Sequence, residues 1–366
     1  MGNLVYCLPL EGIFGVVTTS IRKEVLMHSQ HARRLSRRQF LGGVALAGTA
    51  GLLGWYPRRA AAEPPPEMTR LRLVKIPSVC LAPQYVAEEF LRAEGFLDVQ
   101  YLEFPEGASG ITERLASGAI DITQFYVTNF LGQIDKGAPV LFLAGVHPGC
   151  QELLAGERVR TIADLKGKTI AIPYGSPEWW LIVPVLGYIG LDYRKDVRFV
   201  EHSPADSLRL IADGTIDAFM AAPPLAQEAR AHKVGHVVLN MTTDRPWSQY
   251  FCCMVVANRE FARKYPVATK RALRAILKAD QICAVEPERV ARALVDGRFT
   301  KSYDYAVQAM REVPYGRWRE YDPEDTVRFY ALRLHEAGGI KSSPTKIIAQ
   351  GTDWRFLNAL RKELKG

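Results

Sequence analysis

The 366-residue sequence lacks most of the patterns that mark disulfide-rich proteins and the common hydrolase families. It has six cysteines, of which an odd five follow residue 62, and no Cys-x-x-Cys pair, so the spacing indicates no disulfide framework. It contains no Gly-x-Ser-x-Gly elbow and no His-Glu-x-x-His motif. No segment after residue 62 reads as a membrane span. We therefore predict no catalytic residues and a protein that is not an enzyme.

Excess charge of one sign is also missing from most of the chain. The formal net charge is +8, but residues 1–62 carry eight Lys/Arg against two acids, which leaves +2 for residues 63–366. A nucleic-acid-binding protein needs a basic face. None remains once the N-terminal segment is set aside, so we expect no nucleic-acid partner.

The N-terminal segment has the composition of a targeting sequence. Arg37 and Arg38 precede Phe-Leu and a weakly apolar run rich in Gly and Ala, which leads to three alanines ending at Ala62. This pattern resembles a twin-arginine (Tat) export signal. The resemblance implies the Tat export machinery as a partner, cleavage near Ala62 and a periplasmic location. An uncleaved N-terminal anchor is the alternative, and Met27 is an alternative start to Met1.

Strand-like and helix-like segments alternate from residue 71 to residue 261, and only helices are expected afterwards. Short connections between alternating strands and helices predict parallel sheets covered on both faces. The helical C-terminal part has no strand of its own and must pack on an existing sheet. We therefore predict an α/β fold with two lobes and a cleft between them. Lobe I would comprise residues 69–165 and 256–366, lobe II residues 166–255, with chain crossings near 160–172 and 242–258.

A short phrase occurs once in each predicted lobe. LASGAID (115–121) and IADGTID (211–217) both describe a helix ending at a glycine, followed by an aspartate that begins a strand. Together with TIADLKGKTIAIPYGS and the helical NREFARKYPVATKRALRAILKA, these phrases resemble ABC-transporter periplasmic solute-binding proteins of the nitrate/sulfonate/taurine class, including relatives that bind thiamine-pyrimidine precursors. The resemblance covers about residues 70–340.

The resemblance implies a type II periplasmic binding protein fold. In that fold two doubly wound sheets are joined by a two-segment hinge, and the helical C-terminal region packs on the first lobe. It also implies that a small organic solute is captured by hinge closure and delivered to an ABC permease and its ATPase. We expect a monomer.

In open α/β sheets, ligands bind outside the carboxyl ends of the strands, where helix N-termini also point. The strand-to-helix junctions therefore supply the predicted ligand-binding residues, which are mostly small hydroxyl or aromatic side chains. They are Ser78, Cys80, Leu81, Gln84, Ser109, Tyr126, Thr128, Tyr174, Ser176, Trp179, Trp180, Ser203, Pro223, Trp247 and Tyr250. The hydroxyls would hold a carboxylate, a sulfonate or a polar ring edge, or serve only as helix N-caps.

Trp179 and Trp180 follow a Gly-Ser-Pro turn and point about 100° apart on a first helical turn. We expect one to pack into lobe II and the other to form a wall for the ligand. The alternative is that both are shared between the core and the lobe interface. Arg245 is the only cation in the predicted cleft loops. A tight nitrate or sulfate site would need more positive charge, so a larger, partly aromatic or heterocyclic solute is favoured.

The cysteines suggest no metal or cofactor. Cys252 and Cys253 lie in an apolar strand-like run and are interpreted as small buried hydrophobes. His147 and Cys150 make a poor metal motif because no second ligand pair accompanies them in the sequence. Two other functions remain open, namely an enzyme on the same fold acting on a pyrimidine-type ligand and a ligand-sensing partner of a membrane receptor.

Overall fold

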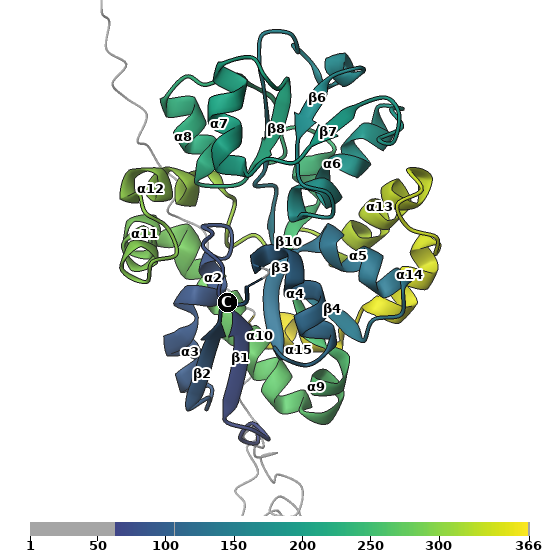
Figure 1. Ribbon diagram of the computed structural model, residues 1–366. Helices are drawn as coiled ribbons and strands as arrows, with labels where there is room; N and C mark the ends of the chain where they lie inside the picture. Colours follow the sequence, from purple (N-terminus) through teal and green to yellow (C-terminus); the bar gives the residue numbers. More distant parts are fainter. Residues whose placement is uncertain (1–62, 106, 365–366) are drawn as a thin grey trace, which may run out of the picture. The chain divides into compact units, whose positions relative to one another are not determined.

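The computed structural model describes residues 63–105 and 107–364, and the chain from Pro64 onward forms one compact unit (Figure 1). Arg37, Arg38 and Ala62 of the predicted export signal lie outside the described residues. Within the compact unit the strands form separate sheets in two lobes, joined by two chain segments.

Lobe I contains two small sheets. β1 (Arg70–Val74) pairs in parallel with β2 (Asp98–Leu102). In the second sheet, β10 (Phe251–Asn258) lies between β3 (Ile122–Tyr126) and β4 (Val140–Pro148) and is antiparallel to both. Every residue of these last three strands is buried, because helices cover the sheet.

Lobe II contains one five-stranded sheet with the order β7-β6-β8-β5-β9. Its strands are β5 (Glu152–Ala155), β6 (Thr169–Ala171), β7 (Arg198–Val200), β8 (Ala218–Ala221) and β9 (His236–Asn240). Its helices are the 3₁₀ turn η2 (Ile162–Leu165), α6 (Pro177–Tyr188), α7 (Pro204–Ala212) and α8 (Leu225–Ala231). The 3₁₀ turn η3 (Trp247–Gln249) precedes the return to β10.

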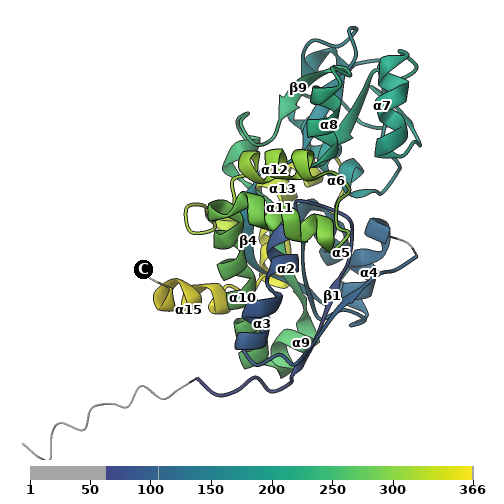
Figure 2. The ribbon, with the colours of Figure 1, turned by 90° about the vertical axis from the view of Figure 1, so that its left-hand side faces the viewer.

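The remaining helices belong to lobe I, as the side view shows (Figure 2). They are α2 (Ala82–Val86), α3 (Glu88–Ala93), η1 (Gly107–Gly110), α4 (Ile111–Ala116), α5 (Val127–Asp135), α9 (Arg259–Lys264), α10 (Pro266–Val285), α11 (Pro287–Asp296), α12 (Tyr303–Glu312), α13 (Pro323–Glu336), α14 (Pro344–Gly351) and α15 (Arg355–Glu363). α10 packs on α2, α3 and α15, whereas α13 and α14 pack beside α5. The lobes touch where α12 packs on α8 and where α6 packs on α5 and α13.

The first change of sheet lies earlier than the sequence suggested. Only residues 149–151 separate β4 from β5, so the chain enters the lobe II sheet there and not near 160–172. In the lobe II sheet, β5 is antiparallel to both of its neighbours, β8 and β9. It therefore does not belong to a run of parallel strands joined by crossover helices. The prediction of purely parallel sheets is therefore wrong, because the lobe II sheet is mixed and the β3-β10-β4 sheet is antiparallel. The four-residue β5 was missed because it has no alternating pattern.

The repeated phrase has the same structure in both lobes. Gly118 and Gly214 each adopt φ +74° just after a helix, which confirms their role in ending it. Asp121 accepts a hydrogen bond from the backbone N–H of Arg72 in β1 (2.8 Å), and Asp217 accepts one from the first residue of β6 (2.9 Å). Each aspartate thus ties its own strand to the neighbouring strand.

Candidate functional site

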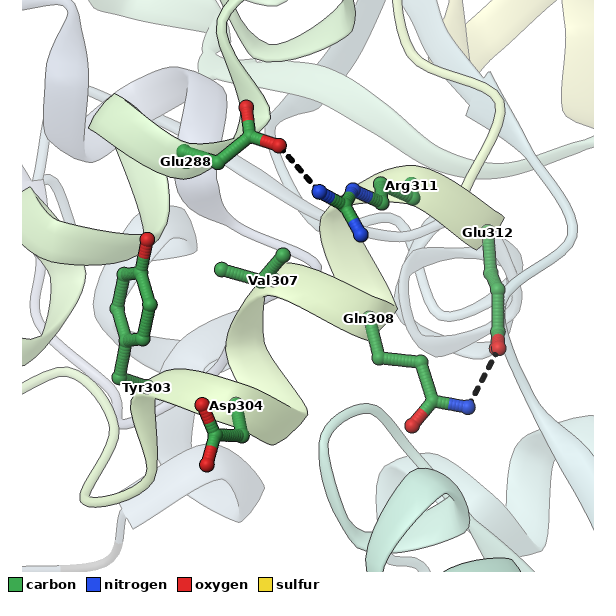
Figure 3. Close-up of a pocket in the computed structure, with 7 residues that line it drawn as sticks. All are labelled: Glu288, Tyr303, Asp304, Val307, Gln308, Arg311 and Glu312. Carbon is green, nitrogen blue, oxygen red and sulfur yellow. Dashed lines mark hydrogen bonds and ion pairs between the residues drawn. The ribbon is translucent and has the colours of Figure 1, made fainter.

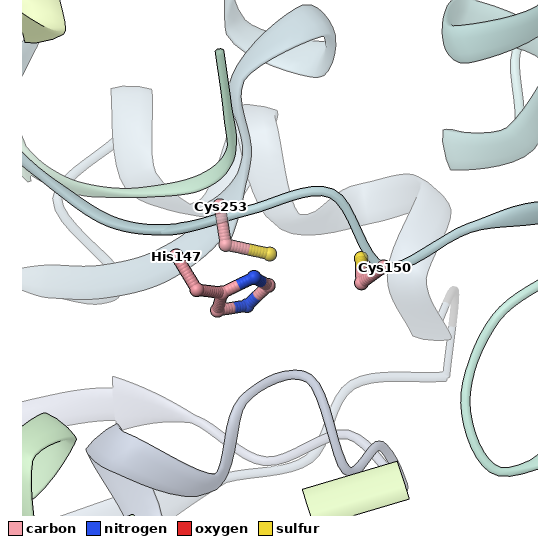
Figure 4. Close-up of side chains that lie close together, drawn as sticks. All are labelled: His147, Cys150 and Cys253. Carbon is pink, nitrogen blue, oxygen red and sulfur yellow. The ribbon is translucent and has the colours of Figure 1, made fainter. Parts of the chain in front are cut away.

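The two segments that join the lobes meet at a group of buried sulfur atoms. Cys150 lies between β4 and β5, and Cys252 lies at the start of β10. Their Sγ atoms are 3.0 Å apart. The Sγ atoms of Cys150 and Cys253 and a ring nitrogen of His147 all lie within 4.8 Å of one another (Figure 4).

Lobe I supplies a fourth sulfur atom from the connection between β1 and α2. The Tyr126 hydroxyl lies 3.7 Å from Cys80 Sγ, and Gln124 Nε2 donates to the Cys80 carbonyl (2.8 Å). We call Cys80, Cys150, Cys252 and Cys253 the thiol cluster. All four side chains are buried and none is in a disulfide.

The His147 ring is held between backbone carbonyl groups. Nδ1 lies 3.0 Å from the Gly149 oxygen and Nε2 lies 3.1 Å from the Cys80 oxygen. The ring also packs edge-on against Tyr315, with centroids 5.1 Å apart. Burial lowers the pKa of His147, whereas Cys252 and the carbonyl groups oppose that effect. Both ring nitrogens therefore face oxygen atoms of the chain.

The sequence argument against a metal at His147 and Cys150 fails, because the fold brings Cys252 and Cys253 beside them. The geometry supplies a different argument. Two thiolates on a tetrahedral zinc ion lie about 3.8 Å apart, since Zn–S bonds are about 2.3 Å. The sulfur atoms of Cys150 and Cys252 are closer, at 3.0 Å, and the His147 nitrogens are directed at carbonyl oxygens. As arranged, Cys150 and Cys252 are too close to ligate one tetrahedral ion together, and His147 is already engaged by carbonyl groups.

The cysteines of the thiol cluster differ in acidity. Burial raises the pKa of Cys150 and of Cys253. Burial also opposes ionisation of Cys252, but hydrogen bonds from the other two thiols and the nearby His147 lower its pKa well below the usual value. Of Cys150, Cys252 and Cys253, Cys252 is thus the one that most readily becomes a thiolate.

Several buried polar atoms beside the thiol cluster have no partner within the protein. They are Gln124 Oε1, Thr128 Oγ1, Asn129 Oδ1 and both amide atoms of Gln151. Each of these side chains is at most 5% exposed. An unpaired buried polar group costs about 1–3 kcal/mol. Such a group in a native fold indicates a partner from outside the chain, such as a ligand or ordered water.

The helix that carries two of these atoms is open at its N-terminus. Thr128 and Asn129 lie in the first turn of the nine-residue α5, whose N-cap residue Tyr126 makes no side-chain capping bond. The N–H groups of this turn carry partial positive charge and can donate to a ligand oxygen. Hydroxyl, amide and N–H groups therefore converge here without a full cation.

Cations close to this region are already paired. Glu152 follows Gln151 directly and binds Arg230 (2.6 Å), which also binds Glu312 of α12 (2.5 Å). Arg245, the cation of the predicted cleft loops, is exposed. Neither Arg230, which pairs with two carboxylates, nor the exposed Arg245 offers a buried, unpaired positive charge to the thiol cluster.

The structure brings three of the predicted ligand-binding residues into this region, namely Cys80, Tyr126 and Thr128. Leu81 is buried beside Cys80. Gln84 is buried too, but its amide is used by the Val74 carbonyl (2.9 Å) and by the backbone N–H of residue 124 (2.9 Å). Gln84 is therefore a structural residue.

Other predicted residues have structural partners. Ser176 accepts from the Trp179 N–H (3.2 Å) and Ser203 from the Asp206 N–H (3.1 Å), so both are helix N-caps. Tyr174 is 76% exposed. Ser78 is half-buried and Ser109 lies in η1. Pro223 is buried and precedes a cis bond to Pro224. The Tyr250 ring stacks on the Phe329 ring, with centroids 3.9 Å apart.

The two adjacent tryptophans lie in different surroundings. Trp179 is buried in lobe II, with its ring 5.4 Å from that of Tyr193. Trp180 is half-buried and reaches α5 of lobe I, where a Cβ built on Gly132 would lie 2.7 Å from its ring. Trp247 is 1% exposed and packs against Tyr188, Phe329 and Tyr330, as a core residue does.

Sequence reasoning missed His147, Cys150, Gln151, Cys252 and Cys253 as site residues. Their position in the chain could have indicated them, because both stretches that contain these cysteines lie where the chain passes from one sheet to another.

A surface pocket of about 460 Å³ lies over α11 and α12 (Figure 3). Its lining includes Glu288, which pairs with Arg311, and Gln308, which donates to Glu312 (2.9 Å). It contains none of the unpartnered buried atoms described above, so it is a weaker candidate than the region around the thiol cluster.

None of the helices in the described part of the chain combines the length and hydropathy needed to cross a membrane.

Comparison with known proteins gives a family match. A model described as the NMT1-like family matches residues 64–295. A putative aliphatic sulfonates-binding protein of Escherichia coli (strain K12) is 27% identical over 246 residues, which is 66% of this chain and 74% of that protein. A putative binding protein of Brucella abortus (strain 2308) is 29% identical over 37% of this chain, and the match spans less than half (43%) of that relative.

Solved structures share the fold. The periplasmic nitrate-binding protein NrtA from Synechocystis PCC 6803 matches with a TM-score of 0.66 at 18% identity, covering 82% of this chain and 90% of that chain. The desulfurization enzyme DSZB matches with a TM-score of 0.57 at 14% identity, covering 81% of this chain and all of that chain. The two-lobed periplasmic binding protein fold predicted from the sequence is confirmed, and it is a fold that enzymes also use.

Proposed function

The chain belongs to the NMT1-like family, and on that basis we propose that it is the periplasmic solute-binding component of an ABC importer. It captures a small organic solute between its lobes and delivers it to a permease and its ATPase. The observation that carries the proposal is the set of unpartnered buried polar atoms beside the junction of the lobes. The sulfonates-binding relative and the nitrate-binding structural neighbour support the class.

The chemistry of these atoms favours a solute bound by neutral groups. Thr128 and Gln151 offer a hydroxyl and an amide, and the N-terminus of α5 offers N–H groups. Tyr126 and Tyr315 add aromatic surface next to the thiol cluster. We infer a sulfonate or taurine-like solute, an aromatic acid or a pyrimidine-like ring, held without a dedicated cation.

Contacts between the lobes support capture by hinge closure. Arg230 and Gln227 of α8 bind Glu312 of α12 at 2.5 and 2.9 Å. Trp180 of α6 covers Gly132 of α5. These contacts join the lobes on both sides of the crossing segments, so they would form and break as the lobes close and open.

The proposal includes export of the protein to the periplasm. The Tat-like signal with Arg37 and Arg38 would take the folded chain to the periplasm, with cleavage near Ala62, and the protein would act as a monomer.

The test is a ligand screen on the purified protein after unfolding and refolding, which removes bound solute. Sulfonates, nitrate, aromatic carboxylates and pyrimidines are tested by thermal shift and then by calorimetry. A solute at 100 times its Kd adds about 2.7 kcal/mol to the unfolding free energy.

A matched pair of variants localises the site. Thr128→Val should weaken binding of the solute found, whereas Ser203→Ala, which removes only the exposed N-cap of α7, should leave its Kd unchanged. Equal loss in both variants, or binding unaffected by Thr128→Val, would contradict the site. A screen in which no solute binds would contradict the function.

A further inference from the structure

The two chain segments that join the lobes approach each other through a pair of sulfur atoms. Cys150 and Cys252 are 102 positions apart in the sequence, and their Sγ atoms are 3.0 Å apart. A disulfide bond is about 2.05 Å long, so a movement of about 1 Å separates this contact from a covalent bond. Cys150 lies in the segment that joins β4 to β5, and Cys252 is the second residue of β10, directly after the segment that returns from lobe II. A bond between them would therefore link the outgoing segment to the point where the returning segment meets lobe I.

The pair has the chemical asymmetry of an exchange-active dithiol. The thiolate is the reactive form in thiol–disulfide exchange. Either sulfur atom can donate in the 3.0 Å contact between Cys150 and Cys252. Against the effect of burial, Cys150, Cys253 and His147 lower the pKa of Cys252, whereas burial raises the pKa of Cys150. Cys252 is thus the attacking sulfur, and Cys150 stands in contact with it as the resolving thiol.

A metal ion is the competing use of these side chains. Both ring nitrogens of His147 face carbonyl oxygens, and the Cys150 and Cys252 sulfur atoms are closer than two ligands of one tetrahedral ion would be. Direct contact between two sulfur atoms is what a dithiol needs before it is oxidised.

We propose that Cys150 and Cys252 form a reversible disulfide that ties the two crossing segments together and restrains the hinge. The oxidant is a low-molecular-weight disulfide. The Cys252 thiolate attacks one of its sulfur atoms, its S–S bond breaks and one thiolate leaves. Cys150 then loses its proton and attacks Cys252 Sγ in the mixed disulfide, which releases the second thiolate. One protein thiolate and one protein thiol are oxidised to the disulfide, and the external disulfide is reduced to one thiolate and one thiol, which takes the Cys150 proton.

Access to the pair depends on the state of the lobes. Cys150 is 3% and Cys252 is 1% exposed. The exchange therefore proceeds when the lobes separate. This inference does not rest on the identity of any solute.

The experiment treats the full-length protein with glutathione disulfide, blocks free thiols with iodoacetamide and digests with trypsin without reduction. The expected product is a linked pair of peptides, residues 137–158 and 234–259, which dithiothreitol separates. Because the second peptide holds both Cys252 and Cys253, variants assign the bond. Cys150→Ser and Cys252→Ser should reduce the linked product at least about tenfold. Cys253→Ser, and Cys283→Ser in the buried part of α10, should retain it.

A second readout tests the effect on the hinge. Amide hydrogen exchange in residues 149–153 and 241–252 should slow on oxidation and recover on reduction, without a change in the α10 amides. The proposal is overturned if the folded wild-type protein yields no linked peptide. It is also overturned if Cys252→Ser still links, or if the thiols resist oxidation because the purified protein carries stoichiometric zinc. If the rate of amide hydrogen exchange in residues 149–153 and 241–252 is the same before and after oxidation, the proposed restraint on the hinge is wrong.

Discussion

Two carboxylates share one guanidinium where α8 meets α12, and this arrangement predicts an unusual pH dependence of stability. Arg230 binds Glu152 of β5 at 2.6 Å and Glu312 of α12 at 2.5 Å. Burial, helped by the negative charges of Glu312 and Asp244, raises the pKa of Glu152 to about 7 despite the lowering effect of Arg230. Glu312 is the better-solvated partner, and hydrogen bonds from Arg230, Gln227 and Gln308 outweigh burial and lower its pKa.

The sign and size of the effect follow from proton linkage. The folded protein binds the Glu152 proton more tightly than the unfolded chain does. Its contribution to stability is therefore complete below about pH 4.5 and is lost as the pH rises through about 7. At about 1.4 kcal/mol for each pH unit, a rise in pKa from 4.5 to about 7 corresponds to about 3 kcal/mol.

The assay is urea unfolding followed by circular dichroism at several pH values from 5 to 8. Glu152→Gln cannot ionise, so the variant should lose at least about 2 kcal/mol less than the wild type over this range. Glu201→Gln, at an exposed position, is the matched control and should follow the wild type. Equal pH profiles for Glu152→Gln and the wild type would refute the reasoning.

Three further substitutions test the packing around the candidate site. Thr128→Val removes a buried hydroxyl that has no partner, so the unfolding free energy measured in urea should stay equal or rise by up to about 1 kcal/mol; a clear loss would show that the hydroxyl is paired within the protein. Gly132→Ala places a Cβ 2.7 Å from the Trp180 ring, which should displace the indole, change its fluorescence and cost about 1–3 kcal/mol; an unchanged spectrum would mean that the indole does not rest there. Trp247→Ala should cost about 3–5 kcal/mol in urea unfolding because the ring is fully buried, whereas a ligand-wall residue would lose little stability.

Local signals in the sequence predicted local structure well. The glycines of the repeated phrase end α4 and α7 with the same positive φ, because a left-handed residue after a helix strongly favours glycine. α10 to α15 occupy the part of the chain after residue 261, where the sequence predicted only helices. Predictions were weaker where the signal was short. β5 has only four residues, and missing it moved the predicted first crossing by more than ten positions.

The hydroxyl side chains of Ser176 and Thr128 illustrate a limit of reasoning from residue type. Ser176 and Thr128 both begin helices after a strand, and both were predicted to bind the ligand. Ser176 Oγ accepts a bond from its own helix, whereas Thr128 Oγ1 has no partner in the protein. The difference depends on the side-chain orientation relative to the first turn, which the order of residues does not determine.

The thiol cluster could not be found from the sequence for a related reason. In a regular strand, neighbouring side chains point to opposite faces, so Cys252 and Cys253 would not be expected to serve one site. The pairing of β10 with β4 shifts register on both sides of Cys253, and an irregularity of this kind re-aims side chains. This shift falls at the point where the chain returns from lobe II, 102 residues after Cys150. The candidate site and the segments that join the lobes thus occupy the same few residues, so a solute or a covalent bond at this point would act directly on the proposed hinge.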